Sequence, residues 1–215
     1  MKNATQHNKH LNALIKQLRR HDGKPLPTLD PIGRIIHGFL EWNASRKAAE
    51  AAAGRLATVM VDHNELRVSH PSEVAAVLGE RYPRATERAA RLHDVLQAIF
   101  EREHGVSLAA LEKKAKKDVQ KYLLSLPGMV PYVAAQVLLL NFGGHAIPVD
   151  DVTADLLKAQ GVVEPQATVE EIAGFLERHV KAEDAMDTHR RLREWVDGHE
   201  GAGGKSRKPK AENRK

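Results

Sequence analysis

Residues 126–150 read LPGMVPYVAAQVLLLNFGGHAIPVD, and this stretch determines how the rest of the chain is interpreted. The pair Pro127-Gly128 predicts a tight turn, and the apolar run after it predicts a helix that is buried on every side. The double glycine at 143–144 ends that helix, and Asp150 stands where the next helix would begin. The stretch therefore places free backbone N–H groups and a carboxylate near opposite ends of one buried helix.

Helix signals continue on both sides of this stretch. Asp30 followed by Pro31 is typical of a helix start, because aspartate caps the first turn and proline needs no hydrogen bond there. Ser45 is a further candidate cap, and Thr168 with Glu171 forms a capping-box pattern. No run of residues alternates convincingly between apolar and polar. We therefore expect an all-α fold of about ten helices.

Composition limits the kinds of site that the protein can contain. The chain has 215 residues, 42% of them hydrophobic, which suffices for one domain or two small lobes. It has no cysteine, which excludes disulfides, thiolate zinc sites and four-cysteine iron–sulfur clusters. Its histidines lack metal-site spacing, so we expect no metal and no cofactor. We also expect no membrane span and no secretory signal.

The net charge of +5 is concentrated at the two ends of the chain. Residues 1–25 and 201–215 each hold six basic residues and one acidic residue, so the sequence between them is net negative. Basic ends suit a polyanion such as nucleic acid, although a solvated tail without a specific role explains 201–215 equally well. The same two explanations apply to five lysines that precede the central stretch: Lys113, Lys114, Lys116, Lys117 and Lys121.

The central stretch also has ordinary structural explanations. The Pro127-Gly128 turn fits a plain helix–helix connection or a phosphate site made of backbone N–H groups. Asp150 fits a helix cap or a carboxylate that activates water, and Asp151 competes with it for the cap. His145 can be explained as an ordinary loop residue or as a partner of that carboxylate.

Taken together, these features resemble the helix-hairpin-helix DNA glycosylases related to endonuclease III. The Leu-Pro-Gly turn, the apolar helix, the glycine turn and Val149-Asp150 carry the resemblance, and weaker similarity extends over residues 25–198. The resemblance implies a two-lobed fold, with a six-helix barrel lobe at 24–145 that contains the hairpin. Residues 1–23 and 146–200 would form the second lobe, followed by a disordered basic tail at 201–215.

The resemblance assigns chemistry to two positions. Asp150 falls on the catalytic aspartate, which steadies the cationic sugar and orients the attacking water. Tyr132 falls where the bifunctional glycosylase/lyases hold a lysine that forms a Schiff base, and tyrosine has no amine for this step. Tyr132 is therefore expected to line a base pocket, as in the thymine and uracil mismatch glycosylases. A lyase that uses another amine, such as Lys121 or the N-terminus, is a further alternative.

The resemblance also assigns contacts with double-stranded DNA. Asn43 falls in the turn that inserts a polar side chain into the base stack, and an ordinary turn residue explains it equally well. The family hairpin has a second glycine and then a basic residue where this chain has Val130 and Pro131. The expected DNA-binding residues are Asn43, Lys121, Pro127, Gly128, Met129 and Val130.

The sequence thus predicts a monofunctional DNA glycosylase of base excision repair, acting on a mismatched thymine or uracil or on an alkylated base. A catalytically inactive or divergent DNA-binding relative is the alternative, because the lysine and the second glycine are missing. We expect a cytoplasmic, nucleoid-associated monomer that binds DNA containing a lesion or mismatch.

Overall fold

The computed structural model describes residues 4–20 and 25–203. These residues form eleven α-helices and two short 3-10 turns, and none of them lies in a strand, as the all-α prediction requires. No helix in these two ranges is both long and apolar enough to cross a membrane.

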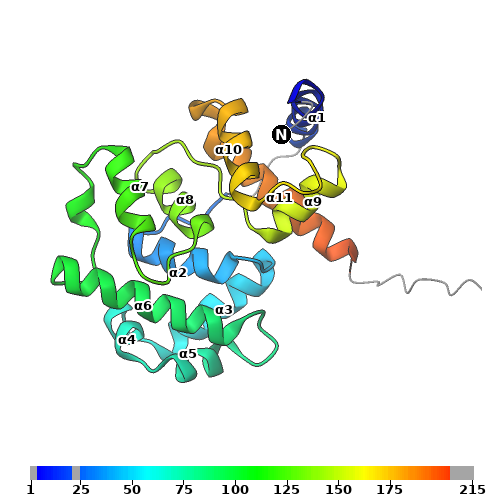
Figure 1. Cartoon of the computed structure of the whole chain (residues 1–215). Coiled ribbons are helices and arrows are strands. Elements are labelled where there is room, and N and C mark those ends of the chain that lie inside the picture. The colour runs from blue at the N-terminus through cyan, green and yellow to red at the C-terminus, as the bar shows by residue number, and fades with distance from the viewer. Residues whose placement is uncertain (1–3, 21–24, 204–215) are drawn as a thin grey trace, which may run out of the picture.

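Seven consecutive helices pack together on one side of the molecule (Figure 1). They are α2 (Pro31–Glu41), α3 (Arg46–Val59), α4 (His63–Val68), α5 (Pro71–Leu78), α6 (Ala85–Glu103), α7 (Lys116–Leu124) and α8 (Pro131–Leu140). A 3-10 turn at Ala109–Leu111 lies between α6 and α7.

The remaining helices form a second group, in which the first helix of the chain lies beside the last (Figure 1). They are α1 (Ala4–Leu18), α9 (Asp151–Ala159), α10 (Val169–His179) and α11 (Ala185–Gly203). A second 3-10 turn, Ala182–Asp184, precedes α11. Because α11 continues to Gly203, it includes the first residues of the predicted tail, and residues 204–215 lie outside the described residues.

The buried apolar side chains form two clusters that follow these groups. The first cluster draws its buried residues from 32–146, and the second draws them from 11–18 and 139–192. The two meet at α8, because Leu138 belongs to the first cluster and Leu139 to the second. The clusters agree with two lobes, and the boundaries at 24–145 and at 1–23 plus 146–200 stay a prediction.

The predicted helix caps are confirmed. Asp30 Oδ1 accepts a hydrogen bond from the Gly33 N–H at 2.9 Å, and the Ser45 side chain caps α3. Thr168 and Glu171 form a reciprocal capping box, with N···O distances of 3.2 and 2.9 Å. Local side-chain chemistry therefore sets where these helices begin, which fixes the loops between them.

Candidate functional site

Asp150 is the N-cap of α9, which resolves the competition with Asp151. Its Oδ1 atom accepts hydrogen bonds from the Thr153 N–H at 2.9 Å and from the Thr153 hydroxyl at 2.6 Å. The cap fixes the carboxylate at the positive end of the helix, where a negative charge is stabilised.

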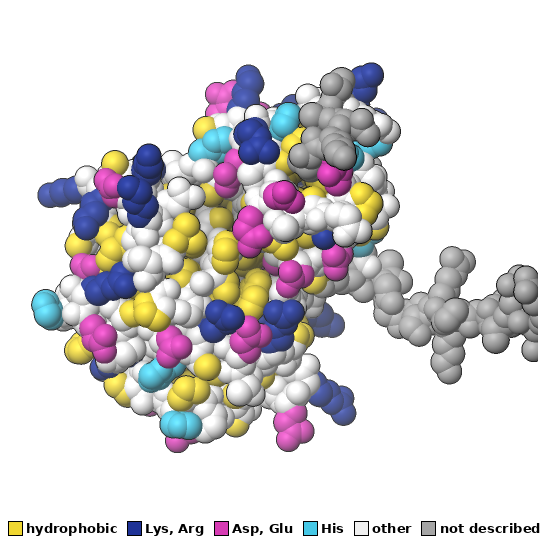
Figure 2. All heavy atoms as spheres, viewed as in Figure 1, with side chains coloured by type: hydrophobic (Ala, Val, Ile, Leu, Met, Phe, Trp, Pro, Cys, Tyr) yellow, Lys and Arg dark blue, Asp and Glu magenta, His cyan; other side chains and the backbone are white. Residues whose placement is uncertain are grey.

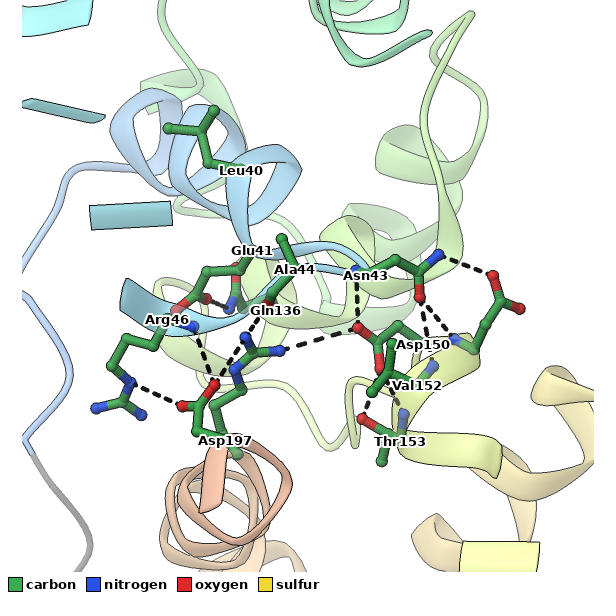
Figure 3. Close-up of polar contacts among 12 residues, drawn as sticks. Leu40, Glu41, Asn43, Ala44, Arg46, Gln136, Asp150, Val152, Thr153 and Asp197 are labelled. Carbon is green, nitrogen blue, oxygen red and sulfur yellow. Dashed lines mark hydrogen bonds and ion pairs between the residues drawn. The ribbon is translucent and has the colours of Figure 1, made fainter. Parts of the chain in front are cut away.

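The other carboxylate oxygen of Asp150 faces the first group of helices (Figure 3). Oδ2 accepts a hydrogen bond from the Asn43 N–H at 2.9 Å and lies 3.9 Å from Nη1 of Arg193 on α11. Asp150 is only 1% exposed. Three segments that are far apart in the sequence therefore hold one buried carboxylate, and both of its oxygens have partners.

Arg193 connects Asp150 to a second carboxylate. Its Nη2 atom lies 3.3 Å from Asp197 Oδ1, and the same nitrogen donates a hydrogen bond to the Ala44 carbonyl oxygen. Burial alone would lower the pKa of Arg193, but the carboxylates around it, Asp197, Glu41 and Asp150, outweigh burial and raise it above its ordinary value. Arg193 therefore stays charged inside the protein and balances the charge of both carboxylates.

Tyr132 lies on α8 in the first apolar cluster. Its side chain is buried, and its hydroxyl has no hydrogen-bond partner within the described residues. Burial raises the pKa of Tyr132 well above its ordinary value, so the phenol is neutral. The expected contact of Tyr132 with a DNA base stays a prediction, since the side chain is enclosed in the DNA-free protein.

A second buried polar group lies beside Arg193, and sequence reasoning missed it. Glu41 Oε2 accepts a hydrogen bond from Gln136 Nε2 at 2.6 Å and lies 3.5 Å from His37 Nδ1. Burial raises the pKa of Glu41, but its contacts with His37, Arg193 and Gln136 outweigh burial and lower it to about 2. A glutamine within the apolar run of α8 was the one sequence signal, because an unpaired amide is costly in a core.

Asn43 spans the two groups of helices through its side chain. Oδ1 accepts hydrogen bonds from the N–H groups of Asp151 at 2.9 Å and Val152 at 3.4 Å, and Nδ2 donates to Asp151 Oδ2 at 2.8 Å. In this state the side chain is bonded to the start of α9 (Figure 3). Its predicted insertion into a DNA base stack would require these bonds to break.

The predicted hairpin is the turn between α7 and α8. Gly128 has φ 79°, and a Cβ atom on it would lie 2.8 Å from the Arg91 carbonyl oxygen of α6. Val130 has φ −108° and is the N-cap of α8, with no side-chain cap, and Pro131 is the first helical residue. The β-branched side chain is therefore unstrained at the position where the family hairpin has its second glycine.

Solved structures of DNA glycosylases have this arrangement of helices. A covalent complex of endonuclease III with DNA superimposes with a TM-score of 0.69 at 18% identity, over 90% of this chain and 85% of that one. A thermostable thymine-DNA glycosylase gives 0.64 at 18% identity, over 89% and 87%. The H. pylori 3-methyladenine DNA glycosylase MagIII gives 0.61 at 16% identity, over 94% and 97%.

The chain has the helix-hairpin-helix DNA glycosylase fold. No protein-family model matches the sequence, and no curated protein sequence matches it either. The fold is thus evident from the arrangement of the helices, at sequence identities too low to show more than the fold.

Two further predicted residues, Lys121 and His145, lie outside the contacts around Asp150. Lys121 is exposed on α7, near the hairpin, and Lys and Arg side chains gather over that region (Figure 2). His145 Nε2 lies 3.0 Å from the Val180 carbonyl oxygen, so His145 joins its loop to the end of α10. Within the described part of this fold, no group of three or more histidines and acids could hold a metal ion.

Proposed function

We propose that the protein is a monofunctional DNA glycosylase that removes a damaged or mismatched base. The observation that carries the proposal is the position of Asp150, which caps the helix that follows the hairpin in a glycosylase fold. The two helix groups meet around this carboxylate, which Asn43 of the first group and Arg193 of the second hold in place. All the groups involved lie in one chain, so a monomer is sufficient.

The proposed reaction is hydrolysis of the N-glycosidic bond of a nucleotide that has been flipped out of the duplex. The bond between C1′ and the base nitrogen breaks, and the base leaves with the electron pair. Asp150 stabilises the positive charge that develops on the sugar, water forms the new bond to C1′, and the proton that the water loses balances the one that the departing base gains. The step consumes one water molecule and needs no cofactor.

Access to Asp150 requires a change in the turn that covers it. The Asn43 N–H is bonded to the carboxylate, and the Asn43 side chain is bonded to the start of α9. We propose that DNA binding moves this turn away, so that the sugar replaces Asn43 beside Asp150. Tyr132 would then line the base pocket, and with no amine it would form no Schiff base with the sugar.

Double-stranded DNA is the proposed partner. The N–H groups at the start of α8 are not capped by a side chain and would face a phosphate beside Gly128 and Met129. The exposed lysines of α7 would extend this contact along the backbone. The basic residues of the tail would add binding that does not depend on sequence, although residues 204–215 lie outside the described residues.

The substitution Asp150→Asn tests the proposal. Asparagine also caps helices well, so the variant should fold and bind DNA, while base release falls at least about 100-fold. The measurement uses duplexes that carry uracil, a G·T mismatch, 3-methyladenine, 8-oxoguanine or an abasic site. Asp155→Asn, which removes an exposed carboxylate one turn further along α9, is the matched control. Base release at the wild-type rate by Asp150→Asn would refute the assignment.

An inactive DNA-binding relative is the second candidate. The observation in its favour is that both oxygens of Asp150 have partners and that Arg193 balances its charge. The same set of duplexes separates the two candidates, because release of any base above background rules out an inactive protein. Borohydride trapping on the abasic duplex tests the remaining lyase alternative, in which another amine attacks the sugar.

A further inference from the structure

Asp151 directly follows the proposed catalytic residue, and its carboxylate lies at the surface. The side chain is 56% exposed, in contrast to that of Asp150. Its Oδ2 atom accepts a hydrogen bond from Asn43 Nδ2 at 2.8 Å and lies 3.7 Å from Arg84 Nη2. One exposed carboxylate on the second group of helices is thus held by two side chains of the first group.

The two side chains that hold Asp151 come from separate connections. Asn43 follows α2 and Arg84 precedes α6, and both have left-handed backbones, with φ 53° and 54°. This conformation is uncommon for residues other than glycine and is often found where the surroundings fix a functional residue. The Arg84 guanidinium also lies 5.2 Å from the centre of the Trp42 ring, which helps to hold it above the turn.

The donors around Asp151 are those that a DNA phosphate takes. An amide N–H and a guanidinium bind carboxylate and phosphate oxygens alike, and both groups are common donors to the DNA backbone. The bond from Asn43 Nδ2 to this carboxylate adds to those that the Asn43 Oδ1 atom accepts at the start of α9, where the Asn43 backbone N–H covers Asp150. A phosphate that displaced Asp151 from these donors would also loosen the turn that closes the site.

We propose that Asp151 is an internal competitor of DNA, whose carboxylate occupies Asn43 and Arg84 in the free protein and yields them to a backbone phosphate. This inference rests on the proposed function, because it requires DNA to approach Asp150. It predicts that the free protein keeps the site closed and that DNA must displace a like charge to open it. Removing the carboxylate should therefore strengthen DNA binding and favour the open state.

The test compares two substitutions on one helix, Asp151→Asn and Asp155→Asn. Both remove one negative charge, but the side chain of Asp155 is 77% exposed and lies 3.9 Å from Lys158 Nζ, away from Asn43 and Arg84. The measured quantity is the Kd for a fluorescent duplex with a stable abasic-site analogue, at several salt concentrations. We expect Asp151→Asn to bind about five-fold more tightly than the wild type at low salt. Asp155→Asn should change the Kd less than two-fold, a threshold set by the modest strength of exposed charge pairs.

Combination with Arg84→Gln completes the test. If Asp151 acts by occupying Arg84, the tighter binding of Asp151→Asn disappears in the Arg84→Gln background. Equal gains for Asp151→Asn and Asp155→Asn, or a gain that persists without Arg84, would overturn the inference. Because binding is measured without catalysis, a protein that binds the duplex but releases no base contradicts the proposed function alone.

Discussion

At the scale of single residues, Arg193 connects two carboxylates of the candidate site. It is 4% exposed and lies between Asp150 and Asp197, within hydrogen-bonding distance of the Ala44 carbonyl. Removing this guanidinium leaves the buried Asp150 carboxylate without its counter-charge, whereas Asp197 keeps Arg46, whose Nε lies 3.4 Å from Asp197 Oδ2. Arg193 therefore supplies the positive charge beside the buried carboxyl group of Asp150.

The substitution Arg193→Met measures this dependence. Methionine fills a similar volume without charge, so the expected loss is about 3–5 kcal/mol in the free energy of unfolding, because breaking a buried pair leaves charge uncompensated. Urea unfolding gives the value. Arg19→Met is the control, because Arg19 is 58% exposed in its pair with Asp184 and should lose less than about 1 kcal/mol. Similar losses for the two variants would show that Arg193 contributes no more than a surface ion pair.

The sequence predicted some of these residues and missed others for one physical reason. The cap at Asp150 is local, since its partner Thr153 lies three positions away, and the two candidate caps were found from sequence alone. Arg193 and Glu41 were not found, because their partners lie in helices far apart in the chain. Such pairing depends on how helices pack, which a pattern of residues along one segment does not contain.

At the scale of elements, the hairpin between α7 and α8 depends on close packing against α6. Gly128 combines a positive φ with a backbone approach that leaves no room for a side chain. The family hairpin has a second glycine where this chain has Val130. The glycine that packs against α6, Gly128, is present. Val130 fits because its backbone is extended, a conformation that a β-branched residue adopts without strain.

Gly128→Ala should therefore destabilise the protein. The added methyl group would meet the Arg91 carbonyl oxygen at 2.8 Å, and the positive φ adds strain, so we expect a loss of about 1–3 kcal/mol in the free energy of unfolding. Gly54→Ala is the matched change, because Gly54 lies within α3 with no atom within 4 Å of the added Cβ. This control should gain up to about 1 kcal/mol. A neutral Gly128→Ala in thermal or urea unfolding would contradict the packing argument.

At the scale of the whole molecule, buried polar groups form a layer where the two apolar clusters meet. Glu41, Gln136, Asp150 and Arg193 belong to it. His189 on α11 belongs to this layer, and burial lowers its pKa to about 4. The Glu41 carboxylate acts against burial, whereas the positive charges of Arg193, Arg34 and Arg46 act with it. Unfolding lets His189 return to its ordinary pKa of 6.5, so the unfolded chain binds an extra proton between these two values.

This layer makes the stability depend on pH. Because the unfolded state takes up more protons, the free energy of unfolding should fall as the pH drops from 6.5 towards 4, by up to about 1.4 kcal/mol per pH unit. Glu41 adds a loss in the same direction at lower pH, between its ordinary value of 4.5 and about 2. His189→Asn should flatten the first slope in urea unfolding, and His104→Asn at an exposed position should not. Parallel curves for the wild type and His189→Asn would exclude this origin.

The overall fold, like the individual helices, could be predicted from the sequence. Hydrophobic spacing and caps such as Asp30 and Thr168 gave the all-α class, and the order of turn, apolar helix and aspartate pointed to the glycosylase arrangement. The closed state of the site was not predictable. It results from Asn43 and Arg84 reaching across to α9, and these contacts exist only after the two groups have packed.

The contact between Asp150 and Arg193 also bears on the order in which the protein is made. A growing chain presents Asp150 to solvent before Arg193 has left the ribosome, because α11 follows α9 and α10 in synthesis. Until α11 docks, the carboxylate lacks its buried counter-charge and the turn at Ala44 lacks its hydrogen bond from Arg193. A translation product that stops short of α11 would therefore carry Asp150 without the setting proposed for its chemistry.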